Sequence, residues 1–199
     1  MSSKLNKLMA AAALSLLAGT AAQAQTVLKV HHFLPSGSSS QVKIIAPWCA
    51  KIEKESGGEL KCQIYPAMQL GGTPPQLLDQ VRDGVADIVW SVPTYSAGRY
   101  TKSEVFELPF MAINAKQGSQ ALWEYVQKNA LDEYKGIKPL FMHTTEGYVL
   151  HSNKPILKLE DMKGKKIRTA TRISARMMSA MGGTPVQMPL PQVPDALSK

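Results

Sequence analysis

The sequence predicts an α/β protein built on a mostly parallel β-sheet. Short apolar segments with the length of strands alternate with segments that carry apolar residues at helical spacing. A strand that reaches the next strand through a helix joins a parallel neighbour, because the crossover returns the chain to the same edge of the sheet. The alternation starts again in the last third of the chain, so a second α/β unit is expected there.

Residues 1–24 are predicted to be a secretory signal peptide. Lys4 and Lys7 precede an apolar run over residues 8–18, and residues 22–24 place small side chains at the spacing of a cleavage site. The run is too short for a membrane-spanning helix. We therefore expect export to the periplasm and cleavage after Ala24, which removes two lysines and lowers the formal net charge from +8 to +6.

The mature chain is expected to open with a buried strand over residues 27–30. Three serines at residues 38–40 can then cap a helix with one apolar face. Pro47 lies inside the helical pattern and predicts a kink or a late helix start. The apolar face is expected to consist of Val42, Ile45, Cys49 and Ile52.

His31 and His32 directly follow this strand. A histidine pair could indicate a metal site, but adjacent residues of a strand point to opposite faces of the sheet. No acidic residue or cysteine stands at ligand spacing from them. We therefore expect no metal and no cofactor.

Cys49 and Cys62 are the only cysteines of the chain. Cys62 lies on the apolar side of a strand predicted from the alternation over residues 60–64, and a tight Gly-Gly turn separates that strand from the helix of Cys49. In an oxidising compartment, this arrangement brings the two within bridging distance. We expect a disulfide, with two free thiols in the core as the alternative.

A second helix is predicted over residues 74–84, and a continuous apolar strand follows at residues 87–91, which completes a β-α-β-α-β order. Trp90 and Tyr95 stand at the carboxyl edge of that strand. Ligands bind at this edge in open α/β sheets, so both residues are candidates for lining a pocket. For Trp90, packing in the core is the alternative.

A long helix is predicted over residues 115–134, and a further strand over residues 137–142. The inward face of the helix is expected to carry Leu122, Tyr125, Val126 and Leu131. The chain is then expected to cross to a second unit at residues 144–148. A new strand is predicted at once, over residues 148–152.

Arg168 is the candidate for binding an anion. A strand over residues 167–169 leads into a helix that Thr169 or Thr171 can cap, so Arg168 stands where a strand ends and a helix begins. A planar guanidinium at this position is suited to holding a carboxylate at two points. The alternative is a surface arginine that pairs with a nearby acid.

The helix after Arg168 is expected to turn Ile173, Met177, Ala180 and Met181 inward, with a solvated face that carries Arg172 and Arg176. A strand from Val186 and a short helix over residues 193–199 close the chain. The basic residues form no cluster dense enough for nucleic acid, so we expect none as a partner. The Gly-x-Ser-x-Gly signature of many hydrolases is absent from the sequence.

The order of motifs resembles the DctP-type solute-binding proteins of tripartite ATP-independent periplasmic (TRAP) transporters over essentially the whole mature chain. The motifs that carry the resemblance are His-His-Phe, Tyr-Pro-Ala-Met-Gln-Leu-Gly-Gly, Asp-Gly-Val-Ala-Asp-Ile-Val, Glu-Leu-Pro-Phe and Asp-Met-Lys-Gly-Lys-Lys-Ile-Arg. The resemblance implies a periplasmic-binding-protein-like fold in which two α/β domains close on a solute in the cleft between them. It places a first domain at residues 25–145 and the start of a second, incomplete domain at residues 146–199.

The resemblance also implies a function and a set of site residues. In this family an arginine in the position of Arg168 grips the solute carboxylate. Members that bind sialic acid carry a second arginine where this chain has Tyr148 and an acidic residue near Val92, and both departures argue against sialic acid. The expected ligand is a small organic acid with an apolar or aromatic body, held by Arg168, Phe33, Trp90, Tyr95, Tyr148 and Leu190.

The expected role is therefore periplasmic capture of a carboxylate by a monomeric, non-enzymatic receptor that delivers it to the membrane subunits of a TRAP transporter. Family chains are longer than this one, which implies a chain that is truncated in its second domain. Two alternatives remain at this stage. One is an exported ligand-sensing protein for a membrane signalling receptor, and the other is an exported hydrolase of organic acid derivatives.

Overall fold

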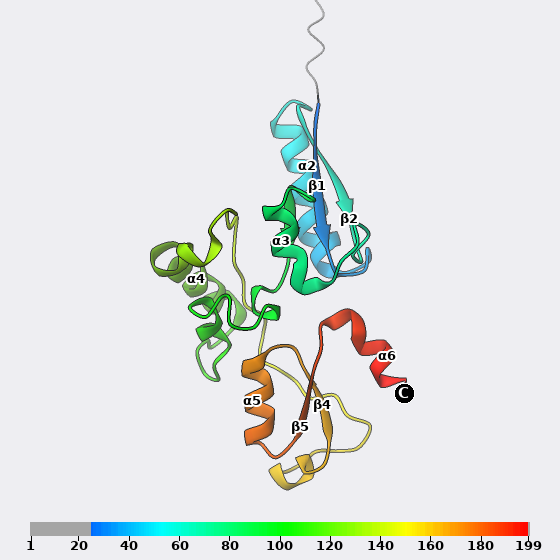
Figure 1. The fold of residues 1–199 in the computed structure, drawn as a ribbon, viewed down its shortest axis with the longest axis vertical. Coiled ribbons are helices and arrows are strands. Elements are labelled where there is room, and N and C mark those ends of the chain that lie inside the picture. The colour runs from blue at the N-terminus through cyan, green and yellow to red at the C-terminus, as the bar shows by residue number, and fades with distance from the viewer. Residues whose placement is uncertain (1–24, 199) are drawn as a thin grey trace, which may run out of the picture.

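The computed structural model describes residues 25–198, so the predicted signal peptide, residues 1–24, lies outside the described residues. Three parallel strands form the first sheet, in the order β2-β1-β3; Figure 1 shows β1 beside β2. They are β1 (Thr26–His32), β2 (Leu60–Tyr65) and β3 (Ile88–Trp90). The helices α2 (Ala46–Glu55) and α3 (Leu77–Arg82) connect them in turn. This arrangement confirms the predicted α/β class and the β-α-β-α-β order.

Pro47 marks a late start of α2, as its position predicts. A π-helical turn (Gln41–Ile45) precedes the helix, and Pro47 lies in the first turn of α2, where its missing N–H is not needed. The prediction that Val42 faces inward is wrong, because its side chain is 55% exposed. The wider π-helical turn changes the angular spacing, so Val42 no longer shares a face with Ile45 and Cys49.

Two hydrophobic clusters cover the opposite faces of the three-stranded sheet. Ile45 and Cys49 of α2 pack on Val30, whereas Leu77 of α3 packs with Phe33 and Leu34. Only the carboxyl half of β1 is buried, since Val27 is 48% exposed, so the prediction of a fully buried first strand is wrong. The core therefore lies below the carboxyl edge of the sheet, where the site residues stand.

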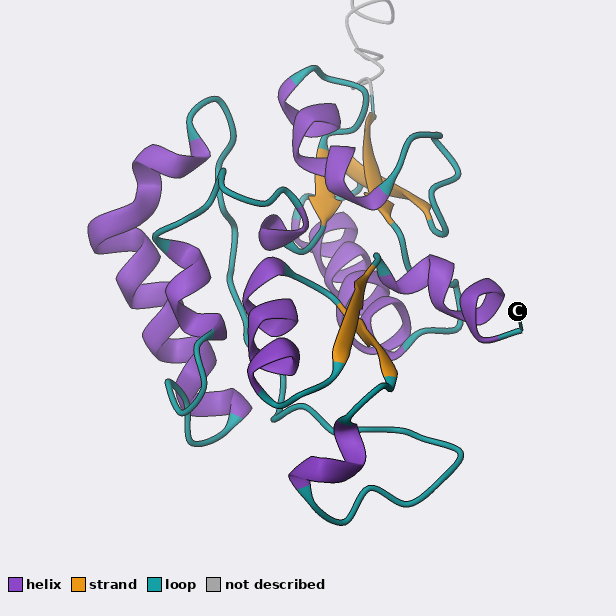
Figure 2. Ribbon diagram, turned by 60° about the horizontal axis from the view of Figure 1, so that its bottom comes forward, coloured by secondary structure: helices purple, strands orange, loops and turns teal. Residues whose placement is uncertain are grey.

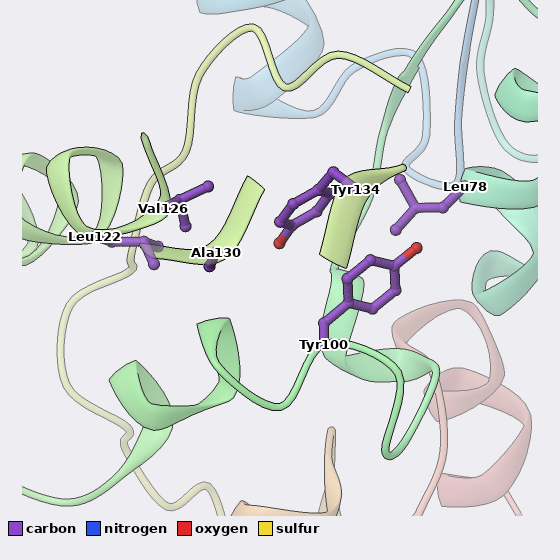
Figure 3. Packing of buried hydrophobic residues seen from close by; sticks show 6 residues of the cluster. All are labelled: Leu78, Tyr100, Leu122, Val126, Ala130 and Tyr134. Carbon is purple, nitrogen blue, oxygen red and sulfur yellow. The ribbon is translucent and has the colours of Figure 1, made fainter. Parts of the chain in front are cut away.

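The predicted long helix forms as α4 (Ala115–Tyr125), which continues through a π-helical turn (Val126–Ala130) and a 3-10 turn (Leu131–Tyr134). The Asn114 side chain caps it by accepting a hydrogen bond from the Gln117 N–H. Leu131 is 45% exposed and not inward as predicted. The cluster that attaches this segment to α3 consists of Leu78, Tyr100, Leu122, Val126, Ala130 and Tyr134 (Figure 3).

Residues 137–142 and 148–152 are extended but form no strands, so both strand predictions are wrong. A strand needs a neighbour for its backbone N–H and C=O groups, and no described strand pairs with either segment. Ile137 and Met142 pack partly buried against the cluster of α4, whereas other apolar side chains remain in solvent: Phe141 is 50% exposed and Val149 is 76% exposed. These segments carry the chain from the region of α4 to the second sheet (Figure 1).

The second sheet pairs β4 (Lys166–Thr169) with β5 (Thr184–Gln187) in parallel and stays separate from the first (Figure 2). The crossover helix α5 (Arg172–Ala180) is capped by Thr171, whose hydroxyl accepts a hydrogen bond from the Ser174 N–H. The buried residues of α5 are Ser174 and Met178, one position away from the predicted inward face. The last helix, α6 (Val193–Leu197), follows β5.

The remaining helical elements are short 3-10 turns. They are Pro74–Gln76, Pro93–Tyr95, Ser103–Glu107, Leu159–Met162 and Leu190–Gln192. Within residues 25–198, no helix has the length and apolar character needed to cross a membrane.

Candidate functional site

A cavity of about 1370 Å³ lies between the carboxyl edge of the three-stranded sheet and α5. Its walls include the start of α2 with the turn before it, the loop after β3, the segment around residues 106–114, the segment 137–148, and α5 with its flanking residues. Pockets for small ligands usually measure roughly 300–1,000 Å³, so a small organic acid would occupy only part of this space. Trp90, Tyr95 and Tyr148 are among the residues that line it.

Trp90 and Tyr95 are held by a third ring behind them. The ring of Phe33 lies 5.4 Å from that of Trp90 and 5.6 Å from that of Tyr95, in tilted geometries that aromatic pairs favour. Phe33 is 3% exposed and does not line the cavity, so it supports the aromatic wall from the core. The sequence places Phe33 directly after the strand residue His32, which is why it reaches both rings.

His143 forms a second layer on Trp90. The two rings stack with centroids 5.7 Å apart, and Trp90 Nε1 donates a hydrogen bond to His143 Nε2 at 3.2 Å. His143 in turn stacks on Phe141 at 5.9 Å. His143 is not among the residues predicted from the sequence, because it lies in a segment expected to precede a crossing and carries no motif.

Arg168 is oriented by a single carbonyl. Its Nε and Nη2 atoms donate to the Met188 carbonyl oxygen at 3.1 and 2.9 Å, across the β4–β5 pair. This contact occupies the side of the guanidinium. The end formed by Nη1 and the second hydrogen of Nη2 binds no protein acceptor among the described residues, and this end has the geometry of a carboxylate fork. Arg168 is half-buried next to the cavity and does not form part of its wall.

Tyr148 connects the guanidinium to the cavity. Although 63% of the residue is exposed, desolvation of its hydroxyl raises the pKa of Tyr148, the charge of Glu107 raises it further, and the charge of Arg168 opposes the shift. Tyr148 is therefore close enough to both charged groups to experience their fields. Tyr148 and Glu107 both line the cavity.

Leu190 joins the second sheet to the aromatic wall through its backbone. Its N–H donates to the Tyr95 hydroxyl at 3.3 Å, while its side chain is 45% exposed and lies outside the cavity wall. Of the six predicted ligand-binding residues, three line the cavity: Trp90, Tyr95 and Tyr148. The other three, Phe33, Arg168 and Leu190, surround it and contact or influence those that do.

Glu107 is a charged group of the cavity wall that the sequence-based predictions did not include. Its two carboxyl oxygens accept short hydrogen bonds, Oε1 from the Thr94 hydroxyl and Oε2 from the Thr171 hydroxyl. Burial raises the pKa of Glu107, Glu104 adds to the shift, and the two hydroxyl bonds oppose it. The available signal was the Glu-Leu-Pro-Phe motif, which carries Glu107 but assigns it no role.

A second carboxylate on the same turn has a different partner. Glu104 is 4% exposed, and Arg172 binds both of its oxygens, with Nε 2.6 Å from Oε1 and 2.8 Å from Oε2. The Arg172 side chain is 37% exposed and does not line the cavity, but it is an ion-pair partner of Glu104 and not only part of a solvated face. The amino end of α5 is held by the turn Ser103–Glu107 through Thr171 and Arg172, which links the second sheet to the first unit.

The histidine pair has no free ring nitrogen. The backbone N–H groups of Leu70 and Leu34 donate to His31 Nε2 and His32 Nδ1, so the other ring nitrogens donate to the side chains of Gln80 and Gln41. Among residues 25–198, no group of three or more His, Cys, Asp or Glu residues is placed to hold a metal ion. The two histidines therefore serve the packing of the sheet.

Cys49 and Cys62 are joined by a disulfide between α2 and β2, with Cα atoms 5.6 Å apart. The bridge lies on the α2 face of the three-stranded sheet. Neither cysteine lines the cavity, so the bridge belongs to the scaffold.

The geometry defines the class of protein. A parallel α/β sheet presents its carboxyl edge to a second, smaller α/β unit, and an aromatic cavity with one arginine beside it lies between them. This is the arrangement of receptors that hold a small solute between two lobes.

Comparisons with known proteins identify the family. Residues 30–199 match the model of the DctP family, described as bacterial extracellular solute-binding protein, family 7, and the chain belongs to this family. It is a TRAP solute-binding protein by fold and family, as its motifs predict. The family consists of solute-binding proteins, not enzymes, which agrees with the non-enzymatic role that the resemblance implied.

Three solved structures illustrate the similarity. A TRAP solute-binding protein of Rhodoferax ferrireducens, in complex with copurified benzoate, is 47% identical (TM-score 0.85), over 87% of this chain and 54% of that one. A marine metagenome protein specific for aromatic acids, in complex with 3-hydroxybenzoate, is also 47% identical, with a TM-score of 0.85. The match covers 88% of this chain and 55% of that one. A Bordetella bronchiseptica protein with bound mandelate is 28% identical, with a TM-score of 0.78. The match covers 87% of this chain and 55% of that one.

The chain spans about half the length of the curated relatives that it matches. Several of these relatives are named as periplasmic binding proteins, such as the ectoine-binding protein of Halomonas elongata.

Proposed function

We propose that this chain is the solute-binding part of a TRAP transporter that takes up an aromatic monocarboxylic acid such as benzoate. The observation that carries the proposal is the aromatic wall of the cavity, formed by Trp90 and Tyr95 on Phe33, together with the Arg168 guanidinium, whose charge acts on Tyr148 in the same cavity wall. A flat ring can pack against such a wall through offset or edge-to-face contacts. A carboxylate on that ring can bind the guanidinium fork through two charge-assisted hydrogen bonds.

The relatives support the aromatic character of the ligand. Two structures with 47% identity hold benzoate and 3-hydroxybenzoate, and a third with 28% identity holds mandelate. Relatives of 24% identity or lower that hold gulonate or galacturonate share the fold, and their ligands carry no weight for this chain. The ring of such a ligand matches the aromatic wall of Trp90 and Tyr95, and its carboxylate matches Arg168.

The proposed mechanism is capture followed by delivery. The acid binds between the two lobes and stabilises the closed arrangement, because only that arrangement brings Arg168 and the aromatic wall to the same ligand. The closed receptor then docks on the membrane subunits of the transporter. Export through the signal peptide of residues 1–24 would place this cycle in the periplasm, where several relatives are named as binding proteins.

Calorimetry on the complete gene product tests the proposal with three matched probes. Benzoate has both recognised features, cyclohexanecarboxylate lacks the aromatic ring, and benzamide lacks the charge. We expect benzoate to bind at least about 10-fold more tightly than either analogue. Equal binding of benzoate and benzamide would contradict the carboxylate assignment, and equal binding of benzoate and cyclohexanecarboxylate would contradict the aromatic one.

A further inference from the structure

Glu107 places an acidic group in the same cavity that is proposed to receive an acid. It is the last residue of the turn Ser103–Glu107 and lines the cavity together with Thr94, Thr171 and Tyr148. A carboxylate at this place conflicts at first sight with an anionic ligand, because like charges repel. The surroundings of Glu107 resolve the conflict.

Two hydrogen bonds hold the Glu107 carboxyl group in place, and in both it is the acceptor. A threonine hydroxyl has one proton, and Thr94 and Thr171 each give theirs to a different carboxyl oxygen. The Thr171 oxygen is itself engaged as an acceptor from the Ser174 N–H, which leaves its proton for Glu107. Both oxygens are therefore satisfied by neutral donors, which oppose the rise in the pKa of Glu107 that burial causes.

No cation neutralises this carboxylate in the described part of the chain. None of the ion pairs there involves Glu107, whereas Glu104, one turn earlier, is paired with Arg172. The neighbours of Glu107 that titrate or carry charge are Glu104, which repels it, and Tyr148. The negative charge of Glu107 raises the pKa of Tyr148, whereas the positive charge of Arg168 lowers it. Tyr148, in the cavity wall, thus experiences the charges of both Arg168 and Glu107, and only Glu107 lines the cavity itself.

We propose that Glu107 restricts the cavity to acids with a single carboxylate by repelling a second one. This inference rests on the proposed function, since it requires that the first carboxylate is bound at Arg168. A ligand held at Arg168 would enter the cavity beside Tyr148, whose hydroxyl experiences the charge of Glu107. A neutral ring is accepted there, and a second carboxylate has no partner and faces a like charge. Selectivity of this kind comes from a repulsive element rather than from an added contact.

The first experiment needs no variant. Binding of isophthalate, which has carboxylates at two ring positions, is compared with binding of its monomethyl ester, which has nearly the same shape and one charge less. Both are titrated into the complete gene product at about pH 8, well above the ordinary pKa of a carboxyl group. We expect the monoester to bind at least about 10-fold more tightly than the diacid, because like-charge juxtaposition is costly. Equal binding of the two would overturn the proposal.

The second experiment removes the charge. In Glu107→Gln, the affinity for isophthalate should rise by at least about 10-fold, while the affinity for benzoate stays within about 3-fold because Gln keeps an acceptor for a threonine hydroxyl. Glu104→Gln is the matched control: it removes a carboxylate from the same turn that faces Arg172 and not the cavity, and it should leave the isophthalate-to-benzoate ratio unchanged. Glu107→Asp retains the charge and should retain the rejection of isophthalate.

The outcomes separate the two proposals. If benzoate binds to the parent protein but Glu107→Gln gains nothing for isophthalate, the role of Glu107 is wrong and the proposed function stands. If Glu104→Gln gains as much as Glu107→Gln, the effect comes from the overall charge and the role of Glu107 is again wrong. If neither benzoate nor the monoester binds to the parent protein, the proposed function itself fails.

Discussion

Replacing Arg168 by lysine tests the carboxylate contact most directly. The substitution keeps the positive charge and removes the planar fork. In the structure, one side of the guanidinium already binds the Met188 carbonyl through Nε and Nη2, and the opposite end is left for a ligand. A lysine ammonium is a point charge that cannot hold Met188 and a two-point carboxylate in the same geometry.

The size of the effect follows from the bonds that are lost. The variant Arg168→Lys would forfeit at least one charge-assisted hydrogen bond, which corresponds to about 1.5–3 kcal/mol. This free energy equals a loss of about 10- to 150-fold in affinity. Arg176→Lys is the control, because Arg176 is exposed on the following helix, α5, and does not line the cavity.

The assay is calorimetric titration of the complete gene product with benzoate, with thermal unfolding of the unliganded variants as a check on folding. We expect Arg168→Lys to unfold near the parent temperature and to bind benzoate about 10- to 150-fold more weakly. Arg176→Lys should match the parent in both measurements. Unchanged affinity in Arg168→Lys would show that Arg168 does not hold the carboxylate.

Three further predictions concern the scaffold. The bridge between Cys49 and Cys62 should stabilise the exported protein by about 3 kcal/mol, given its short loop; two alkylatable thiols without prior reduction, detected by mass spectrometry, would refute it. Burial lowers the pKa values of His31 and His32, so the unfolded chain binds protons more readily than the folded protein. The stability that is present above about pH 6.5 should therefore be lost as pH falls towards 5. An unfolding temperature that does not change over this pH range would contradict this prediction. The polypeptide 25–199 expressed alone should aggregate or melt without cooperativity, since its extended segments expose apolar side chains; a monodisperse product stabilised by benzoate would overturn this expectation.

The strands and helices with a strong local period could be predicted from the sequence. Alternation around Cys62 and the apolar run at Ile88 correspond to β2 and β3, and Thr171 caps α5 as its residue type indicates. The register within helices was less predictable. Ser174 is buried and Val42 is exposed, because neighbouring elements and a π-helical turn decide which face turns inward.

The two strand predictions that failed have a common cause. Residues 137–142 and 148–152 have strand-like composition, but a strand exists only when its backbone pairs with another strand, and that partner is a property of the whole fold. Composition cannot reveal whether the partner is present.

The sequence by itself determined the family, the α/β class and the position of Arg168 at a strand end, because motifs, apolar periods and capping residues are local signals. Only the tertiary structure decided which groups meet. It brought Phe33 behind Trp90 and Tyr95. It also placed Glu107 between Thr94 and Thr171, although Thr171 follows Glu107 by 64 residues in the chain. A charge becomes selective only through its burial and its neighbours, and both are set by segments that are distant in the chain.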